Sequence, residues 1–510
     1  NQALTEGARN ELTGHFHRCM ATLTDTIHYS DGRTVLYCPA FEYNSVSEAA
    51  KEKDLLQIME SVVIHWTRQI KDVVNNLDNS SSAETSGPLD EIEFWKTRAQ
   101  DLIGIQEQLQ GVNVQRIVDA LQYAKSNYIG PFHNLTKQIV TRASEANDNL
   151  KYLESIRNHC VQLREIEANN VVTVLPDLLS RIRLIWTFSA FYNNQERVCG
   201  LLRKVSNEII HRFRNHVPIA DILDGDVEFC MVRLHESIDC GVEWKAIYYK
   251  TVSAISRNLA AKGQSTGGWD GASIFAQIDA FVQRCRDLLE LCESQMQFCR
   301  KSAATDGKPG PLPQFGGTKA QEIISGIVGI QASFEQEIDR LRHLDYDMLD
   351  VRVSRWHDDY HHFKTAVKDL EIMFANVINT AFESNITIQE GSNLIATFHM
   401  LAKRDAVKTS VSRKAMELQV TFVQFVQSTR SEFEQGKQNP PIRQHEPQFA
   451  GSALWAHSLA AKVKDDFEAL GKKLKPVLST RHLDEARDVA NAFLNAVRDF
   501  KVNRYTHWIN

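Results

Sequence analysis

The chain has 510 residues, of which 43% are hydrophobic and 24% are charged, and its formal net charge is -6. This length exceeds what one hydrophobic core normally serves, so several consecutive cores are expected. The charge is too small for a chain of this size to indicate nucleic acid or an acidic membrane surface as a partner.

Three other general features bear on class and compartment. No apolar run approaches the roughly 20 residues of a membrane-spanning helix, so a soluble chain is expected. The start, NQALTEGARNEL, has no Met, basic segment or apolar signal core, which indicates that residue 1 is an internal position. The nine cysteines include no CxxC pair, as is typical of a reducing compartment such as the cytoplasm.

The first 50 residues predict a helix followed by a turn. The apolar positions of this helix recur every three or four residues, as in an amphipathic helix: Leu4, Ala8, Leu12, Phe16, Cys19, Leu23 and Ile27. Residues 31–39 then break the pattern with Asp-Gly, a β-prone run and a proline. Any strand in the chain is therefore expected near residues 33–38.

Residues 55–109 predict two long helices joined by a polar loop at 75–86. The buried face of the first is predicted to carry Leu55, Met59, Val62, Trp66, Ile70 and Val73. The second begins at Gly87-Pro88 with Asp90 and Glu91 in its first turn, where carboxylates favour the positive end of the helix dipole. Its predicted buried face carries Ile92, Trp95, Ala99, Leu102 and Leu109.

Further periodic segments follow, separated by glycine, proline and polar residues. Up to residue 301, the expected helices cover 111–125, about 135–160, 178–192, 197–216, 224–261 and 272–301, with Pro176 interrupting or starting one of them. Residues 302–317 contain three prolines and four glycines and predict an exposed linker. Beyond it, helices are expected at 319–344, 349–382, 387–404 and 407–436, followed by a loop at 438–447 and two more helices.

The predicted fold class is therefore all-α: an elongated string of irregular antiparallel helical bundles, with at most one short strand near residues 33–38. No repeat of fixed period is present, so a regular solenoid is not predicted. The expected divisions are residues 1–50, 51–301, the linker 302–317 and 318–510.

Two motifs stand out in the sequence. The first combines Glu60-Ser61 and Ile64-His65-Trp66 with Gly87-Pro88-Leu89 and the run from Glu91 to Trp95. The second combines Asn439-Pro440-Pro441, Pro447, Ala450-Gly451 and Trp455-Ala456. Together they resemble the first N-terminal tail region of dynein heavy chains, and the axonemal ones most closely. The family commonly has Arg after this Trp-Ala pair, where the chain has His457, so a salt bridge from that Arg is not expected here.

The resemblance implies a non-catalytic tail fragment of an axonemal dynein heavy chain that acts as a scaffold. It implies association with other heavy chains near residues 1–50, and binding of WD-repeat intermediate chains and light chains along 318–510. It also implies docking on the doublet microtubule of a cilium or flagellum. The ATPase ring and the microtubule-binding stalk would lie beyond residue 510, so no nucleotide cofactor is expected here. With the charge and apolar runs described above, neither nucleic acid nor a membrane is expected as a partner.

The strongest candidate for a metal site is His357, Asp358 and His361, because two histidines at i and i+4 share a helix face. The Glu of a zinc-protease motif and a third ligand are absent, so a solvated helix face is the preferred interpretation. A helical metal-dependent enzyme centred on these residues, or a tethering or spectrin-like rod, remain alternative functions. No catalytic, cofactor or metal residue is assigned.

Other candidate groups are interpreted as structural. Cys19 is expected in a core, with His15 and His17 on the surface. Cys285, Cys292 and Cys299 lie seven residues apart, which is the spacing of a packing seam rather than of thiolate ligands.

A glycine-rich turn and two basic runs complete the candidates. Residues 263–271 lack the strand and lysine of a phosphate loop, and Trp269 is expected to anchor this turn. The basic runs at 197–214 and 403–414 are interrupted by acidic residues and are predicted to be solvated faces, with an acidic partner subunit as the alternative.

Overall fold

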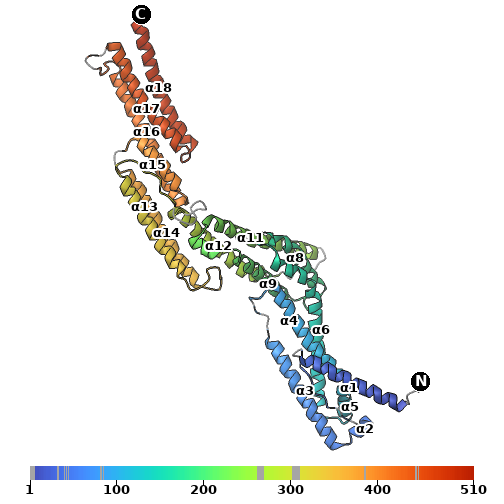
Figure 1. Cartoon of the computed structure of the whole chain (residues 1–510). Coiled ribbons are helices and arrows are strands. Elements are labelled where there is room, and N and C mark those ends of the chain that lie inside the picture. Colours follow the sequence, from blue (N-terminus) through green and yellow to red (C-terminus); the bar gives the residue numbers. More distant parts are fainter. Residues whose placement is uncertain are drawn as a thin grey trace, which may run out of the picture. The chain divides into compact units, whose positions relative to one another are not determined.

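The structure is a computed structural model, and it is all-helical over the residues that it describes (Figure 1). These residues are 6–30, 34–39, 41, 43, 45–80, 83, 85–260, 269–300, 310–383, 386–442, 445 and 447–509. They form two compact units. Unit 1 comprises Asn1–His216 with Glu236–Val282, and unit 2 comprises Val217–His235 with Gln283–Asn510.

Unit 1 is built from short and medium helices, together with parts of two long helices, α11 (Val227–Ala260) and α12 (Gly271–Phe298). Its other elements are α1 (Glu6–Ser30), α2 (Val46–Ala49), α3 (Lys53–Asn79), α4 (Pro88–Leu109), α5 (Val112–Tyr123), α6 (Ile129–Glu154), α7 (Arg157–Glu165), the 3-10 turn η1 (Ala168–Asn170), α8 (Val171–Phe188) and α9 (Gln195–Arg214).

Unit 2 takes the remaining parts of α11 and α12, together with the short helix α10 (Ile219–Asp224) that precedes α11. The helices that follow α12 complete it: α13 (Ala320–Arg342), α14 (Arg355–Ala381), α15 (Ile388–Leu401), α16 (Asp405–Gly436), α17 (Gln448–Leu474) and α18 (Thr480–Ile509). α13 packs on α14, while α15, α16, α17 and α18 pack on one another as a bundle. The prediction of an all-α chain of helical bundles is thus confirmed for the described residues.

The two helices predicted at 55–109 are present with the predicted faces buried. α3 buries Met59, Val62, Trp66 and Ile70 as predicted, and Val74 is buried in addition. Leu55 and Val73, also predicted on this face, are only half-buried. All five residues predicted for the face of α4 are buried. α3 packs on α5 and α6, and α4 packs most extensively on α6, so neighbouring helices cover both apolar faces.

The start of α4 follows the predicted capping chemistry. Pro88 occupies the first turn, where its missing amide hydrogen has no helical partner to lose. The Asp90 carboxylate accepts a hydrogen bond from the backbone N–H of Gly87 at 2.9 Å. The loop predicted at 75–86 begins later than expected, because α3 continues to Asn79.

The strand allowed near residues 33–38 is not formed in the described part, residues 34–38. The backbone bonds to a side chain instead of to a neighbouring strand. Gln108 of α4 accepts a hydrogen bond from the Leu36 N–H at 2.7 Å and donates one to the Thr34 carbonyl at 2.8 Å. The Trp66 indole donates to the Tyr37 carbonyl at 2.7 Å. The segment is therefore bound to two helices through their side chains, which give three of its backbone groups a hydrogen-bond partner without a sheet.

Most predicted helix boundaries differ from the structure by a few residues, and three differences are larger or change the interpretation. The helix expected over 135–160 breaks between α6 and α7, where Ser155 and Ile156 lie outside both helices. Pro176 neither ends nor starts a helix but lies inside α8. The helix expected from residue 349 begins only at Arg355, and the preceding residues form turns.

The side-chain amide of one buried residue in unit 1 has no hydrogen-bond partner among the described residues. Asn149 of α6 is fully buried, and among the described residues neither atom of its side-chain amide has a partner. A buried amide without partners destabilises the folded state. Asn149→Leu should therefore raise the free energy of unfolding by about 1 kcal/mol, or Tm by roughly 2–4 °C for a unit of this size.

Calorimetry of the whole chain checks this prediction. The matched control is Asn134→Leu on an exposed position of the same helix, which should leave Tm unchanged. A fall in Tm for Asn149→Leu would contradict the prediction and would indicate a buried water that satisfies the amide.

Candidate interaction surfaces

The apolar stripe predicted near the N-terminus lies on a solvent-exposed face of α1. Leu12 is 63% exposed and Leu23 is 59% exposed, and Phe16 and Met20 are also exposed. The prediction that Cys19 lies in a core is wrong, because Cys19 is exposed on this same helix. His15 is exposed as predicted, whereas the side chain of His17 lies outside the described residues.

The histidines considered as metal ligands lie on an exposed face of α14. His357, Asp358 and His361 all have exposed side chains, as the solvated-face interpretation predicts. The adjacent His362 faces Glu337 of α13, with 3.2 Å between its Nδ1 atom and the carboxylate. Among the described residues, no group of three or more His, Cys, Asp or Glu side chains has the arrangement of a metal site.

The cysteine seam of α12 is a packing feature, as predicted. Cys285, Cys292 and Cys299 are buried. Burial raises the pKa of the Cys285 thiol to about 12 and raises that of Cys292 as well. These thiols stay protonated near neutral pH, which suits a small hydrophobic residue rather than a nucleophile.

The tryptophan of the glycine-rich turn is an anchor, as predicted. Trp269 is buried and contacts the Trp186 ring edge-to-face, with 6.0 Å between the ring centroids. The Tyr248 hydroxyl donates to its carbonyl at 3.0 Å. Residues 263–268 of the turn lie outside the described residues.

The prediction that the two basic runs are solvated faces is wrong for one cation in each run, Lys204 and Arg404. Lys204 of α9 is buried, and its ammonium group contacts the carboxylate of Glu91 in α4. In the second run, Arg404 binds Glu371 of α14 at 2.6 Å and Glu290 of α12 at 3.2 Å. Each cation joins helices that are distant in sequence, so these runs contribute to tertiary structure.

Polar side chains on the second half of α12 form hydrogen bonds with several other segments of unit 2. The Gln297 side chain donates to the Leu401 carbonyl at 3.1 Å and accepts from the backbone N–H groups of Lys403 and Arg404 at 2.6 and 2.9 Å. It thus fixes the turn between α15 and α16. This role was not predicted from the sequence, although polar residues recur every three or four positions beside the cysteine seam, at Arg284, Asp287, Glu290, Ser294 and Gln297.

The turn before α14 is bound to the same helix. The Arg284 guanidinium donates to the carbonyls of Met348 at 2.5 Å and Val353 at 3.3 Å. The Trp356 indole donates to Asp287 at 3.1 Å, and the Arg284 guanidinium lies 5.0 Å from the centroid of the Trp356 ring.

The charge of the partly buried Glu290 carboxylate is neutralised by neighbouring cations. Burial alone would raise the pKa of Glu290, but hydrogen bonds from Tyr360, Lys364 and Arg404 outweigh it and hold the pKa below the ordinary value. Glu290 therefore stays ionised at neutral pH and connects α12, α14 and the start of α16.

No described helix combines the length and apolar character that crossing a bilayer requires.

Comparison with known proteins identifies relatives over the whole chain. The family model described as "Dynein heavy chain, N-terminal region 1" matches residues 56–510. The dynein-1-beta heavy chain of the flagellar inner arm I1 complex of Chlamydomonas reinhardtii is 38% identical over 100% of this chain and 11% of its own length. Human dynein axonemal heavy chain 2 is 30% identical over 91% of this chain and 8% of its own length. The chain thus spans about a tenth of the length of these relatives.

Proposed function

Because the chain belongs to the dynein heavy chain family through its N-terminal region, we propose that it is a non-catalytic tail scaffold. In this role it joins heavy chains, holds intermediate and light chains, and helps to dock the motor complex on the doublet microtubule. The observation that carries the proposal is the match of the family's N-terminal region to residues 56–510, which here fold as packed helices.

The names of the related heavy chains indicate where in the cell this chain works. Their names include flagellar inner arm, flagellar outer arm and axonemal heavy chains. The chain is accordingly a cytoskeletal protein of the axoneme.

The fold supports a role in transmitting force. The hydrogen bonds of Gln297 and the ion pairs of Arg404 connect several helices of unit 2 to α12. Buried polar networks whose members are satisfied make a core more rigid. A scaffold that holds other subunits under load needs this rigidity.

We assign heavy-chain association to α1. Its exposed Leu12 and Leu23 present branched apolar side chains to solvent on one helix. Exposed apolar helix faces gain stability by packing on another helix. For the intermediate chain, the proposed surface lies on 318–510, where Ile372 of α14 and Val420 of α16 are exposed.

A crossed co-purification experiment tests both assignments on the whole chain. Leu12→Ser with Leu23→Ser should abolish co-purification of a second heavy-chain tail while the intermediate chain is retained. Ile372→Ser with Val420→Ser should do the converse. Tm should change little in either variant, because all four side chains are exposed.

The matched control for the second variant is Val140→Ser, an exposed valine on α6 of unit 1. Immunoblots against each partner quantify retention. Equal retention of both partners by all variants would reject the surface assignments, and the family membership would be unaffected.

A further inference from the structure

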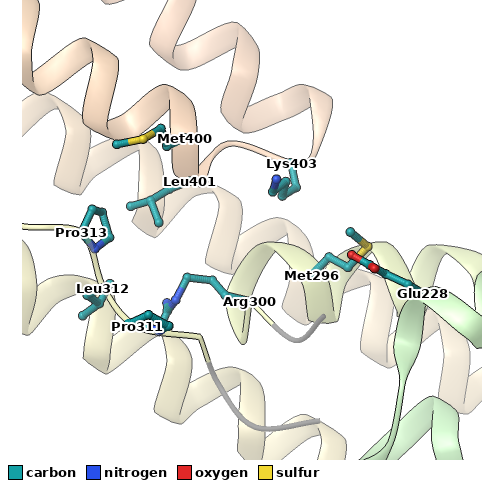
Figure 2. Close-up of a pocket in the computed structure, with 9 residues that line it drawn as sticks. All are labelled: Glu228, Met296, Arg300, Pro311, Leu312, Pro313, Met400, Leu401 and Lys403. Carbon is teal, nitrogen blue, oxygen red and sulfur yellow. The ribbon is translucent and has the colours of Figure 1, made fainter. Parts of the chain in front are cut away.

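A pocket of about 370 Å³ opens in unit 2 beside the end of α12 (Figure 2). Its walls come from α11, α12, the segment before α13, the end of α15 and the turn that follows α15. The volume is near the lower end of the roughly 300–1,000 Å³ of small-ligand sites, so it suits a few side chains rather than a folded domain. The described residues that line it are Glu228, Met296, Arg300, Pro311, Leu312, Pro313, Met400, Leu401 and Lys403.

One part of the pocket is apolar. Figure 2 shows Leu312 and Pro313 facing Met400 and Leu401 across the cavity. Met400 is exposed, and methionine adapts its shape to different apolar groups. This part of the pocket therefore suits an apolar side chain.

Arg300 brings a positive charge into the pocket wall. Its Nε atom donates to the Gly310 carbonyl and its Nη2 atom to the Gln331 side-chain oxygen, each at 3.0 Å. Both acceptors are neutral, and no carboxylate of the described residues forms an ion pair with this guanidinium. Burial lowers the pKa of Arg300, as expected for a half-buried cation.

The backbone at Arg300 adds a second unusual feature. Its φ is 53°, in the left-handed region that residues other than glycine rarely adopt. Such a conformation costs about 1 kcal/mol or more and is retained where the surrounding structure holds it. Here it places a guanidinium, rather than a glycine, at the end of α12.

Lys403 and Glu228 complete the charge pattern. Lys403 is exposed, and its backbone is fixed by Gln297 at 2.6 Å. In Figure 2, Arg300 and Lys403 lie between the apolar part of the pocket and Glu228. Among the lining residues that the structure describes, two cations stand against one carboxylate, which makes this part of the pocket favourable for an anion.

We propose that this pocket binds a short acidic peptide segment of a partner protein, with an apolar side chain against Met400 and Leu312 and a carboxylate between Arg300 and Lys403. An extended peptide suits this pattern, because residues i and i+2 lie on the same side of the chain, about 7 Å apart. The inference does not depend on the scaffold role proposed above, since it concerns binding to the purified chain.

Fluorescence anisotropy with three capped probes on the whole chain tests the proposal. Each probe carries an uncharged dye, and their sequences are Gly-Leu-Ser-Glu-Gly, Gly-Leu-Ser-Gln-Gly and Gly-Leu-Ser-Lys-Gly. The Glu probe should bind about tenfold more tightly than the Gln probe, and the Lys probe least, because only the Glu probe pairs with both cations.

Variants locate the binding site. Arg300→Gln should weaken binding of the Glu probe about tenfold and Lys403→Gln about threefold, since Lys403 is more exposed. Glu228→Gln should strengthen it. Arg355→Gln, an exposed arginine on α14 outside the pocket, should leave binding unchanged. Because Arg300→Gln could disturb the end of α12, Lys403→Glu provides a second measurement, and it should shift preference toward the Lys probe.

Three results would overturn the proposal. The first is equal binding, or no binding, of the three probes. The second is displacement of the Glu probe by inorganic phosphate at the same concentration as the unlabelled peptide, which would indicate a site for small anions. The third is binding that appears only in an Asp306→Asn variant, which would identify residues of this chain's own 301–309 segment, outside the described residues, as the occupant.

Discussion

Arg404→Met should destabilise unit 2 by about 3 kcal/mol, because it leaves a poorly solvated carboxylate without its cation. The side chains of Arg404 and Glu371 are only 14% and 15% exposed, and their closest atoms are 2.6 Å apart. Glu290 keeps its contacts with Lys364 and Tyr360 in this variant. The cost therefore arises mainly at Glu371, for which Arg404 is the partner in the described structure.

Hydrogen exchange measured by mass spectrometry checks where the loss occurs. Faster exchange is expected in α14 and in the first turns of α16, the two elements that the pair joins. Adding Glu371→Gln should restore much of the lost stability, since it removes the isolated charge. The control Arg355→Met breaks an ion pair with Asp345 in which both side chains are exposed, and it should cost no more than about 0.5 kcal/mol.

If Arg404→Met and Arg355→Met were equally mild, the buried network would not determine the stability of unit 2. Acidification gives an independent check. The folded-state pKa of Glu290 lies below its ordinary value of 4.5, so its contribution to stability is present above that pH and is lost as pH falls through the lower value. The difference between wild type and Glu290→Gln should accordingly shrink in acid.

The helices and their buried faces were predictable because they depend on local sequence. Spacing of three and four residues identified the faces of α3 and α4, and Gly87-Pro88 with Asp90 identified the start of α4. The anchoring role of Trp269 and the cysteine seam of α12 followed from the same reasoning. Each of these predictions needs only neighbours within one or two turns.

Partner choice was not predictable, because it depends on residues far away in the chain. Lys204 and Arg404 look like surface cations on their own helices, yet their partners Glu91 and Glu290 are more than 100 residues away. The apolar stripe of α1 gives no indication of whether another element covers it. The break at Ser155 contains neither glycine nor proline, so the helical pattern runs through it.

The extended segment at 34–38 depends on both local sequence and distant partners, and the substitution of one of these partners, Trp66, should have a large effect on stability. Its β-prone composition predicted an extended backbone, but its hydrogen-bond partners are the side chains of Gln108 and Trp66. Trp66 is fully buried, and its ring centroid lies 6.0 Å from that of Phe132. The residue thus serves both the core of unit 1 and the anchoring of this segment.

Trp66→Ala should lower the free energy of unfolding of unit 1 by about 3–5 kcal/mol, because it leaves a large cavity and frees the Tyr37 carbonyl. Trp66→Phe should cost less, since it keeps most of the volume and loses the hydrogen bond. The control Trp508→Ala removes a tryptophan that is 66% exposed and should have a small effect.

The rate of alkylation at Cys38 separates the two roles of Trp66. Cys38 is half-buried and follows Tyr37 directly, so release of the segment exposes its thiol. Both Trp66→Ala and Trp66→Phe should speed labelling at Cys38, whereas Trp508→Ala should leave the rate unchanged. If Trp66→Phe labelled at the wild-type rate, Gln108 alone would hold the segment, because its two hydrogen bonds to Thr34 and Leu36 remain in that variant.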